Sequence, residues 1–147
     1  MTALFTGKEE IIKLLLSVKI KVEDCGISGM TALHCASIAS DDTVATPLID
    51  HGADFRRLDQ TSHSSLDLAA CFATDTKILE LLLTKVEIEQ CDSHGITALY
   101  SAAMASNAVL THYLIERGAD INHDIGGRTL VRNAKASVYQ KQSVDWQ

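Results

Sequence analysis

Apolar residues in this chain gather in short clusters that are separated by polar residues and glycines. Ile11-Ile12 and Leu15-Leu16 are spaced four residues apart, and Ile78-Leu79 and Leu82-Leu83 repeat that spacing. Such spacing places each set on one side of an α-helix. Other stretches consist of small residues, such as 102–105 (AAMA), and alanine has the highest helix propensity. The pattern therefore predicts short helices and not strands.

One hexapeptide pattern returns every 33 residues. The segment 31–36 (TALHCA) is followed by 64–69 (SSLDLA) and by 97–102 (TALYSA). A second landmark, the segment 48–54 (LIDHGAD), returns at twice this period as 114–120 (LIERGAD). Two independent landmarks with one period predict an array of stacked repeat units.

The hexapeptide resembles the ankyrin-repeat signature, T-P-L-H-x-A at a 33-residue period. Thr31, Leu33, His34 and Ala36 match it, and Ala32 replaces the proline. The resemblance covers nearly the whole chain. It implies an all-α ankyrin-repeat solenoid of helix-turn-helix units joined by β-hairpin-like loops, with about three full repeats and two partial terminal ones.

The resemblance also divides the chain. It implies an ankyrin domain over residues 1–136 and a C-terminal tail over 137–147. Within the domain, the predicted full units are 26–57, 58–90 and 91–122, and the predicted partial units are 1–25 and 123–136.

Two segments depart from a regular repeat. In the first partial unit, the segment from Thr6 to Leu16 matches the inter-helix turn and the second helix of the family. Pro47 falls inside the second helix of a full unit, where the missing N–H and the ring cost about 3 kcal/mol. We therefore expect that helix to begin late, near Thr46, or to be bent.

Composition narrows the function classes. Apolar residues make up 46% and charged residues 22%, which is typical of a globular chain. The net charge of −6 disfavours nucleic acid and anionic membranes as partners, because both require Lys and Arg. No run of 18 apolar residues predicts a membrane span, and the N-terminus has no signal-peptide pattern. We expect an intracellular protein, cytoplasmic or nuclear.

The residues that could carry chemistry do not form a recognisable catalytic or metal motif. Only His34-Cys35 and Cys91 with His94 approach zinc-ligand spacing, and we expect no metal and no cofactor. The chain has no nucleophile elbow, P-loop or dinucleotide fingerprint, so we expect no enzyme. The resemblance implies that the His34 ring hydrogen-bonds backbone near the hairpin turn. Cys35 and Cys71 are expected to pack as small apolar residues.

The resemblance places the partner-binding surface in a concave groove formed by hairpin tips and first helices. Ile38, Phe72 and Met104 would form an apolar ladder along this groove, with Met30 and Ile96 beside it. An exposed apolar strip commonly marks an interface, and burial under neighbouring units is the alternative. Carried over position by position, the predicted protein-binding residues are Ile27, Met30, Ile38, Gln60, His63, Phe72, His94, Ile96, Met104 and Arg128.

These features predict a non-catalytic interaction module, an adaptor or scaffold that acts as a monomer and binds another protein. One alternative is a recognition or scaffold segment of a larger multidomain protein, such as a ubiquitin-ligase subunit. Another is a purely structural piece of a longer array. A modification site is also implied by the resemblance. Asn122 stands at the hairpin position that oxygen-dependent asparaginyl hydroxylases modify in ankyrin proteins, with a structural turn asparagine as the alternative.

Overall fold

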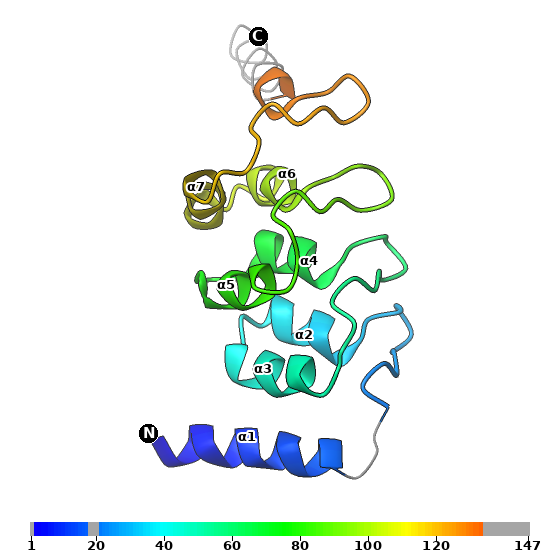
Figure 1. The fold of residues 1–147 in the computed structure, drawn as a ribbon, viewed down its shortest axis with the longest axis vertical. Coiled ribbons are helices and arrows are strands. Elements are labelled where there is room, and N and C mark those ends of the chain that lie inside the picture. Colours follow the sequence, from blue (N-terminus) through cyan, green and yellow to red (C-terminus); the bar gives the residue numbers. More distant parts are fainter. Residues whose placement is uncertain (1, 18–20, 134–147) are drawn as a thin grey trace, which may run out of the picture.

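The computed structural model describes residues 2–17 and 21–133 of the 147-residue chain. An eighth helix begins at Leu130 and is described as far as Asn133. The helices stack into an elongated array from which loops project to one side (Figure 1). The helices that the structure bounds are α1 (Thr2–Ser17), α2 (Ala32–Ile38), α3 (Asp42–Asp50), α4 (Ser65–Phe72), α5 (Lys77–Leu83), α6 (Ala98–Met104) and α7 (Ala108–Glu116).

The helices form two rows. In the first row α2 packs on α4, and α4 packs on α6. Each first-row helix also packs on the helix that follows it, so α3, α5 and α7 form the second row. Helix α1 contacts α3 and extends this second row at the N-terminal end. The predicted ankyrin solenoid is thereby confirmed.

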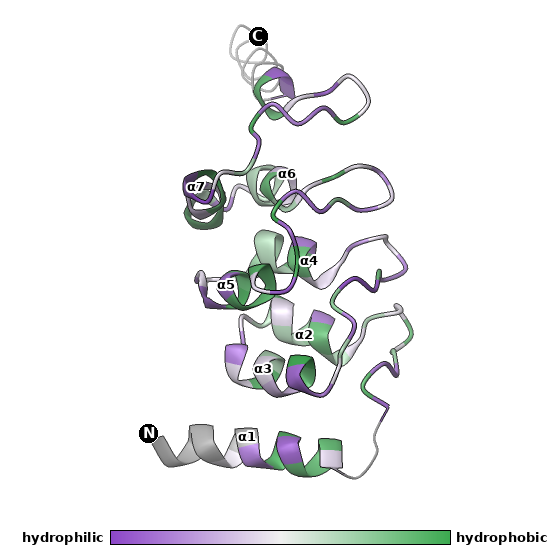
Figure 2. Ribbon diagram, in the orientation of Figure 1, coloured by the Kyte–Doolittle hydropathy of each residue, from purple (hydrophilic) through white to green (hydrophobic). Residues whose placement is uncertain are grey.

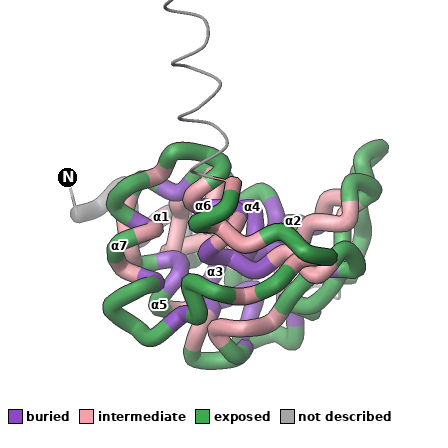
Figure 3. The backbone as a smooth tube through the Cα atoms, turned by 90° about the horizontal axis from the view of Figure 1, so that it is seen from above, coloured by how far each residue is buried: buried purple, intermediate pink, exposed green. Residues whose placement is uncertain are grey.

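The repeated hexapeptide starts each first-row helix and buries its leucine. Thr31, Ser64 and Thr97 are the N-cap residues, with extended backbone, and the Ser64 and Thr97 hydroxyls accept hydrogen bonds from the third helical N–H. Leu33, Leu66 and Leu99 are all buried in one continuous core. Figure 3 shows that the buried residues lie in the middle of the array and that many loop residues are exposed.

The second-row helices α3 and α7 begin and end alike. Asp41 and Asn107 are their N-caps, and each side chain accepts from a backbone N–H three residues later. Gly52 and Gly118 follow their C-termini with φ of 86° and 89°, the left-handed conformation that glycine adopts without steric cost.

Hairpin-like loops connect the units, as predicted. The N–H of Gly26 donates to the carbonyl of Met30, and Asp92 donates in the same way to Ile96. The distances are 3.1 and 3.0 Å, and Cys91 and Thr97 form an isolated antiparallel bridge.

Two expectations were wrong, and a third was wrong in part. Helix α1 runs unbroken through Thr6 and Gly7, where the match to the family placed a turn between two helices. Helix α3 begins at Asp42 and not near Thr46: Asp41 caps it, and Pro47 is buried inside it. A bend at Pro47, the other outcome expected, stays a prediction. Cys35 is exposed and does not pack as a small apolar residue. The predicted tail over 137–147 and the end of the last partial unit lie outside the described residues.

Candidate protein-binding groove

Two pairs of neighbouring hairpin loops touch each other along the array. The N–H of Gln60, in the second hairpin, donates to the carbonyl of Ser28, in the first, at 3.1 Å. The ring of His123 donates from Nε2 to the carbonyl of Gly95 at 3.1 Å and links the later hairpins. These contacts hold the loops as a row at one side of the first-row helices (Figure 1).

Two aspartates shape the middle hairpins from within. Asp59 Oδ1 accepts from the N–H groups of Thr61 and His63, at 2.8 and 3.0 Å. Asp92, one period later, accepts from the N–H groups of His94 and Ile96 at 2.8 and 2.9 Å. Partial burial acts to raise the pKa of Asp59, but the hydrogen bonds outweigh it and the pKa is lowered. The loops are therefore fixed turns and not loose tips.

The predicted apolar ladder is exposed. Ile38, Phe72 and Met104 lie at the C-terminal ends of α2, α4 and α6 and are 36%, 57% and 62% exposed. Since α2 packs on α4 and α4 on α6, the three side chains follow one another along the first row. Their burial under neighbouring units is thus excluded, and their part in binding stays a prediction.

The other predicted groove residues lie on the hairpins. Ile27 is fully exposed, and Met30 and Ile96 are half-buried at the bases of their loops. Gln60, His94 and Arg128 are exposed, whereas His63 is half-buried.

The hairpin histidines place polar groups beside the predicted groove. His63 Nδ1 lies 2.7 Å from the Thr61 hydroxyl and 3.9 Å from Asp59 Oδ1. His94 Nδ1 lies 3.6 Å from Asp92 Oδ2. An apolar strip with hydrogen-bonding groups beside it is the usual composition of a protein interface.

His34 hydrogen-bonds to backbone as expected and joins two units. Its Nδ1 accepts from the N–H of Thr31 at 3.0 Å, so Nε2 carries the proton that it donates to the carbonyl of Arg57 at 3.0 Å. The side chain is fully buried. Asp67 occupies the equivalent position one period later and accepts from the N–H of Ser64 at 2.9 Å. Burial raises the pKa of Asp67, and Asp92 adds to that effect.

Sequence reasoning missed two glutamates that link units. Glu23 Oε1 accepts from the N–H of Asp54, and Glu89 Oε1 accepts from the N–H of Asp120, both at 2.7 Å. Their spacing of twice the repeat period was a visible signal. Arg57 adds an ion pair to Glu23 at 3.6 Å.

Asn122 is exposed, and its N–H donates to Asp120 Oδ1 at 2.9 Å, which makes it part of a turn. Its hydroxylation stays a prediction. Across the described residues, no group of three His, Cys, Asp or Glu side chains is arranged to hold a metal ion. Within the same part of the chain, no helix is both long and apolar enough to traverse a bilayer.

Comparison with known proteins gives two kinds of match. Residues 28–60 and 94–123 each match a family model described as ankyrin repeat. The relatives include the human "Ankyrin repeat and SOCS box protein 6", 36% identical over 99 residues, which are 62% of this chain and 24% of that protein. "Ankyrin repeat and KH domain-containing protein mask-1" of Caenorhabditis elegans is 32% identical over 121 residues, 80% of this chain and 5% of the relative.

A third relative is the "Nuclear factor NF-kappa-B p105 subunit" of Rattus norvegicus, 33% identical over 96 residues, 63% of this chain and 10% of that protein. The chain thus spans a quarter or less of the length of these three relatives.

Proposed function

Since the chain belongs to the ankyrin-repeat family, whose repeats generally serve as protein-interaction modules, we propose that it binds another protein without catalysis. The partner occupies the groove between the hairpin row and the first-row helices. The single observation that carries this proposal is the exposed ladder of Ile38, Phe72 and Met104. Exposed large apolar side chains in a row are costly in water unless a partner covers them.

The chemistry of the groove specifies the kind of segment it would hold. Apolar side chains of the partner would cover Phe72 and Met104, since Met and aromatic residues are enriched at the centres of interfaces. Polar groups of the partner would meet His63 and His94 at the rim. The fixed hairpins reduce the conformational entropy that binding costs, because their turns are already hydrogen-bonded through Asp59.

The alternative is that this chain is the recognition or scaffold segment of a larger multidomain protein, such as a ubiquitin-ligase subunit. The small shares of the relatives that it spans favour that setting. In this case the groove has the same role, and the larger protein determines the fate of the captured partner. We propose an intracellular location for both versions.

The test compares proteins captured from cell extract by wild type, by a Phe72→Asp and Met104→Asp double variant, and by Val109→Asp. Val109 is 58% exposed on α7, in the second row, and is the matched control. Partners held by the groove remain with wild type and Val109→Asp and are lost from the double variant. Circular dichroism must show that all three chains are equally folded.

A captured partner should also slow amide exchange in the hairpins and at the ends of α2, α4 and α6. If the folded double variant keeps every partner, the groove is not the binding site. Protection confined to the second row leads to the same conclusion.

A further inference from the structure

The segments that form the predicted groove contain no Lys or Arg. Each segment consists of a hairpin, a first-row helix and the turn that precedes the next second-row helix, and the three segments are 25–41, 58–76 and 91–107. The whole chain has 13 Lys and Arg residues, and all of them lie outside these segments. The same segments contain five aspartates. A surface with such a distribution has a negative electrostatic potential.

Two of the aspartates follow the apolar ladder in the chain. Asp41 and Asp75 come three residues after Ile38 and Phe72, and Asn107 takes this place in the third unit. Each of the two carboxylates accepts a hydrogen bond from a backbone N–H at the start of the following helix, at 3.2 and 3.1 Å. These bonds hold the negative charges in the turns that follow the ladder.

The helices that carry the ladder add to the negative potential. Ile38, Phe72 and Met104 stand at the C-terminal ends of α2, α4 and α6, where the last carbonyl groups of a helix carry partial negative charge. Figure 2 shows hydrophobic residues along α4 and α6. Asp67 is the one Asp, Glu, Lys or Arg in the three helices, and it is buried.

The hairpins supply the two remaining carboxylates. Asp59 and Asp92 lie within the second and third hairpins, 3.9 and 3.6 Å from the Nδ1 atoms of His63 and His94. Hydrogen bonds lower the pKa of Asp59, so this carboxyl is ionised at neutral pH. A cation that approaches either histidine therefore also approaches a carboxylate.

The Lys and Arg side chains of the described residues belong to other parts of the array. Arg57, which precedes the second hairpin, forms an ion pair with Glu23 at 3.6 Å. Lys77 is the first residue of α5, and Arg117 follows α7, so both belong to the second row. Arg128 is the first cation after the third segment that lies on a hairpin. The three full units therefore present an apolar ladder beside carboxylates.

We propose that the partner segment held in the groove is cationic, with an apolar stretch flanked by Lys or Arg. This inference rests on the proposed function, because it specifies the partner that the groove holds. Apolar side chains of the segment cover Phe72 and Met104, and its Lys or Arg side chains lie near Asp41 and Asp75. Opposite charges beside an apolar contact accelerate association and select the partner.

The same charges disfavour other occupants. Nucleic acid, an acidic peptide and the same groove of a second copy are all negative, so the carboxylates repel them.

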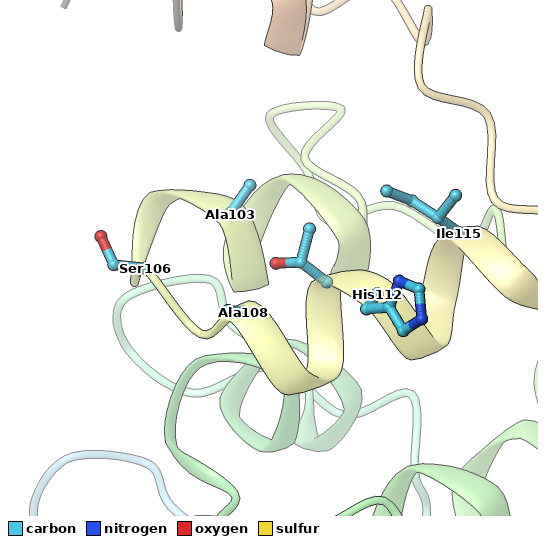
Figure 4. A pocket seen from close by; sticks show the side chains of 6 residues that line it. Ala103, Ser106, Ala108, His112 and Ile115 are labelled. Carbon is cyan, nitrogen blue, oxygen red and sulfur yellow. The ribbon is translucent and has the colours of Figure 1, made fainter.

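A hollow of about 390 Å³ between α6 and α7 is a separate feature (Figure 4). Its lining residues are Ala103, Ser106, Ala108, Thr111, His112 and Ile115. None of the ladder residues lines it, and the proposal does not involve it.

The first test selects peptides from a random library displayed on phage. Three stacked helices span about 20 Å, which a peptide of about 16 residues covers even as a helix. Peptides that bind the 147-residue chain are kept, and those that also bind a Phe72→Gln and Met104→Gln double variant of equal net charge are removed. The remaining peptides depend on the ladder. We expect them to be enriched in Lys and Arg and depleted in Asp and Glu relative to the unselected library.

The outcomes separate this inference from the proposed function. Ladder-dependent peptides that are neutral or acidic would show that the groove binds but does not select a cationic segment. If no selected peptide depends on the ladder, the proposed function fails as well. Circular dichroism must show that the double variant is folded; otherwise the two single variants replace it.

The second test changes the charge of the groove and leaves the ladder intact. Ala39 and Ala105 are exposed C-cap residues with right-handed helical backbone, so they accept longer side chains without strain. Lysine at both positions should weaken binding of a selected peptide about fivefold at low salt, and glutamate at both should strengthen it. Salt should reduce the difference, because it screens exposed charges.

The matched control carries the same added charge on the second row. Thr46→Lys with Val109→Lys places two lysines at exposed positions of α3 and α7. Fluorescence anisotropy of the labelled peptide should give the wild-type dissociation constant for this control. If it weakens binding as much as Ala39→Lys with Ala105→Lys, or if lysine at 39 and 105 has no effect, the groove does not select its partner by charge.

Discussion

Replacing His34 by leucine is expected to lower the free energy of unfolding by about 3 kcal/mol. Leucine fills a similar volume, so the substitution removes hydrogen bonds and leaves the packing nearly intact. The Thr31 N–H loses its acceptor at 3.0 Å in a fully buried site, and the part-buried carbonyl of Arg57 loses its donor at 3.0 Å. Each unpaired buried group costs about 1–3 kcal/mol, the carbonyl at the lower end because it is partly exposed.

The measurement is urea denaturation followed by circular dichroism, with Cys35→Ala as the control. Cys35 is the next residue in α2 and is exposed, so its substitution should change the free energy of unfolding by less than about 0.5 kcal/mol. If the free energy of unfolding of His34→Leu stays within about 1 kcal/mol of the wild-type value, the hydrogen bonds of His34 do not stabilise the array.

Two further predictions concern stability. Burial raises the pKa of Asp67 above its ordinary value of 3.8, so the native state holds that proton more tightly and the stability contribution of the carboxyl falls as pH rises through the raised pKa. Asp67→Asn cannot ionise, so its stability relative to wild type should increase between about pH 4 and about pH 7 in urea titrations; a pH-independent difference contradicts this. Gly118 has a φ of 89° and open space around it, whereas Gly7 lies within α1. Alanine should therefore destabilise the chain at 118 and stabilise it at 7, each by about 0.5–1 kcal/mol, and thermal unfolding that shifts in the same direction for both would refute this.

The repeat and its local chemistry could be predicted from the sequence because they depend on nearest neighbours along the chain. Thr31 and Ser64 are N-caps in any context that starts a helix, and a 33-residue period places Leu33 and Leu66 in equivalent surroundings. The same equivalence between units predicted that Ile38, Phe72 and Met104 lie in a row. Their exposure was harder to predict, because it depends on where the first-row helices end.

The wrong expectations concern residues whose packing neighbours differ from those of the equivalent residues in other units. The match to the family turn at Thr6 and Gly7 was wrong because α1 continues through both residues as one helix. The expected destabilisation by Pro47 considered only the backbone of its own helix. The burial of its side chain in α3 depends on tertiary packing, which the sequence does not reveal. Cys35 was expected to pack as a small apolar residue, but its position on α2 leaves it exposed.

The sequence alone determined the period, the helices that begin at each hexapeptide, and the residues that face the core, because backbone hydrogen bonding and side-chain spacing act over a few residues. Only the tertiary structure decided which equivalent positions are covered. Burial depends on the unit stacked on either side, and it differs between equivalent positions: Leu68 is buried, whereas Cys35, one period earlier, is exposed.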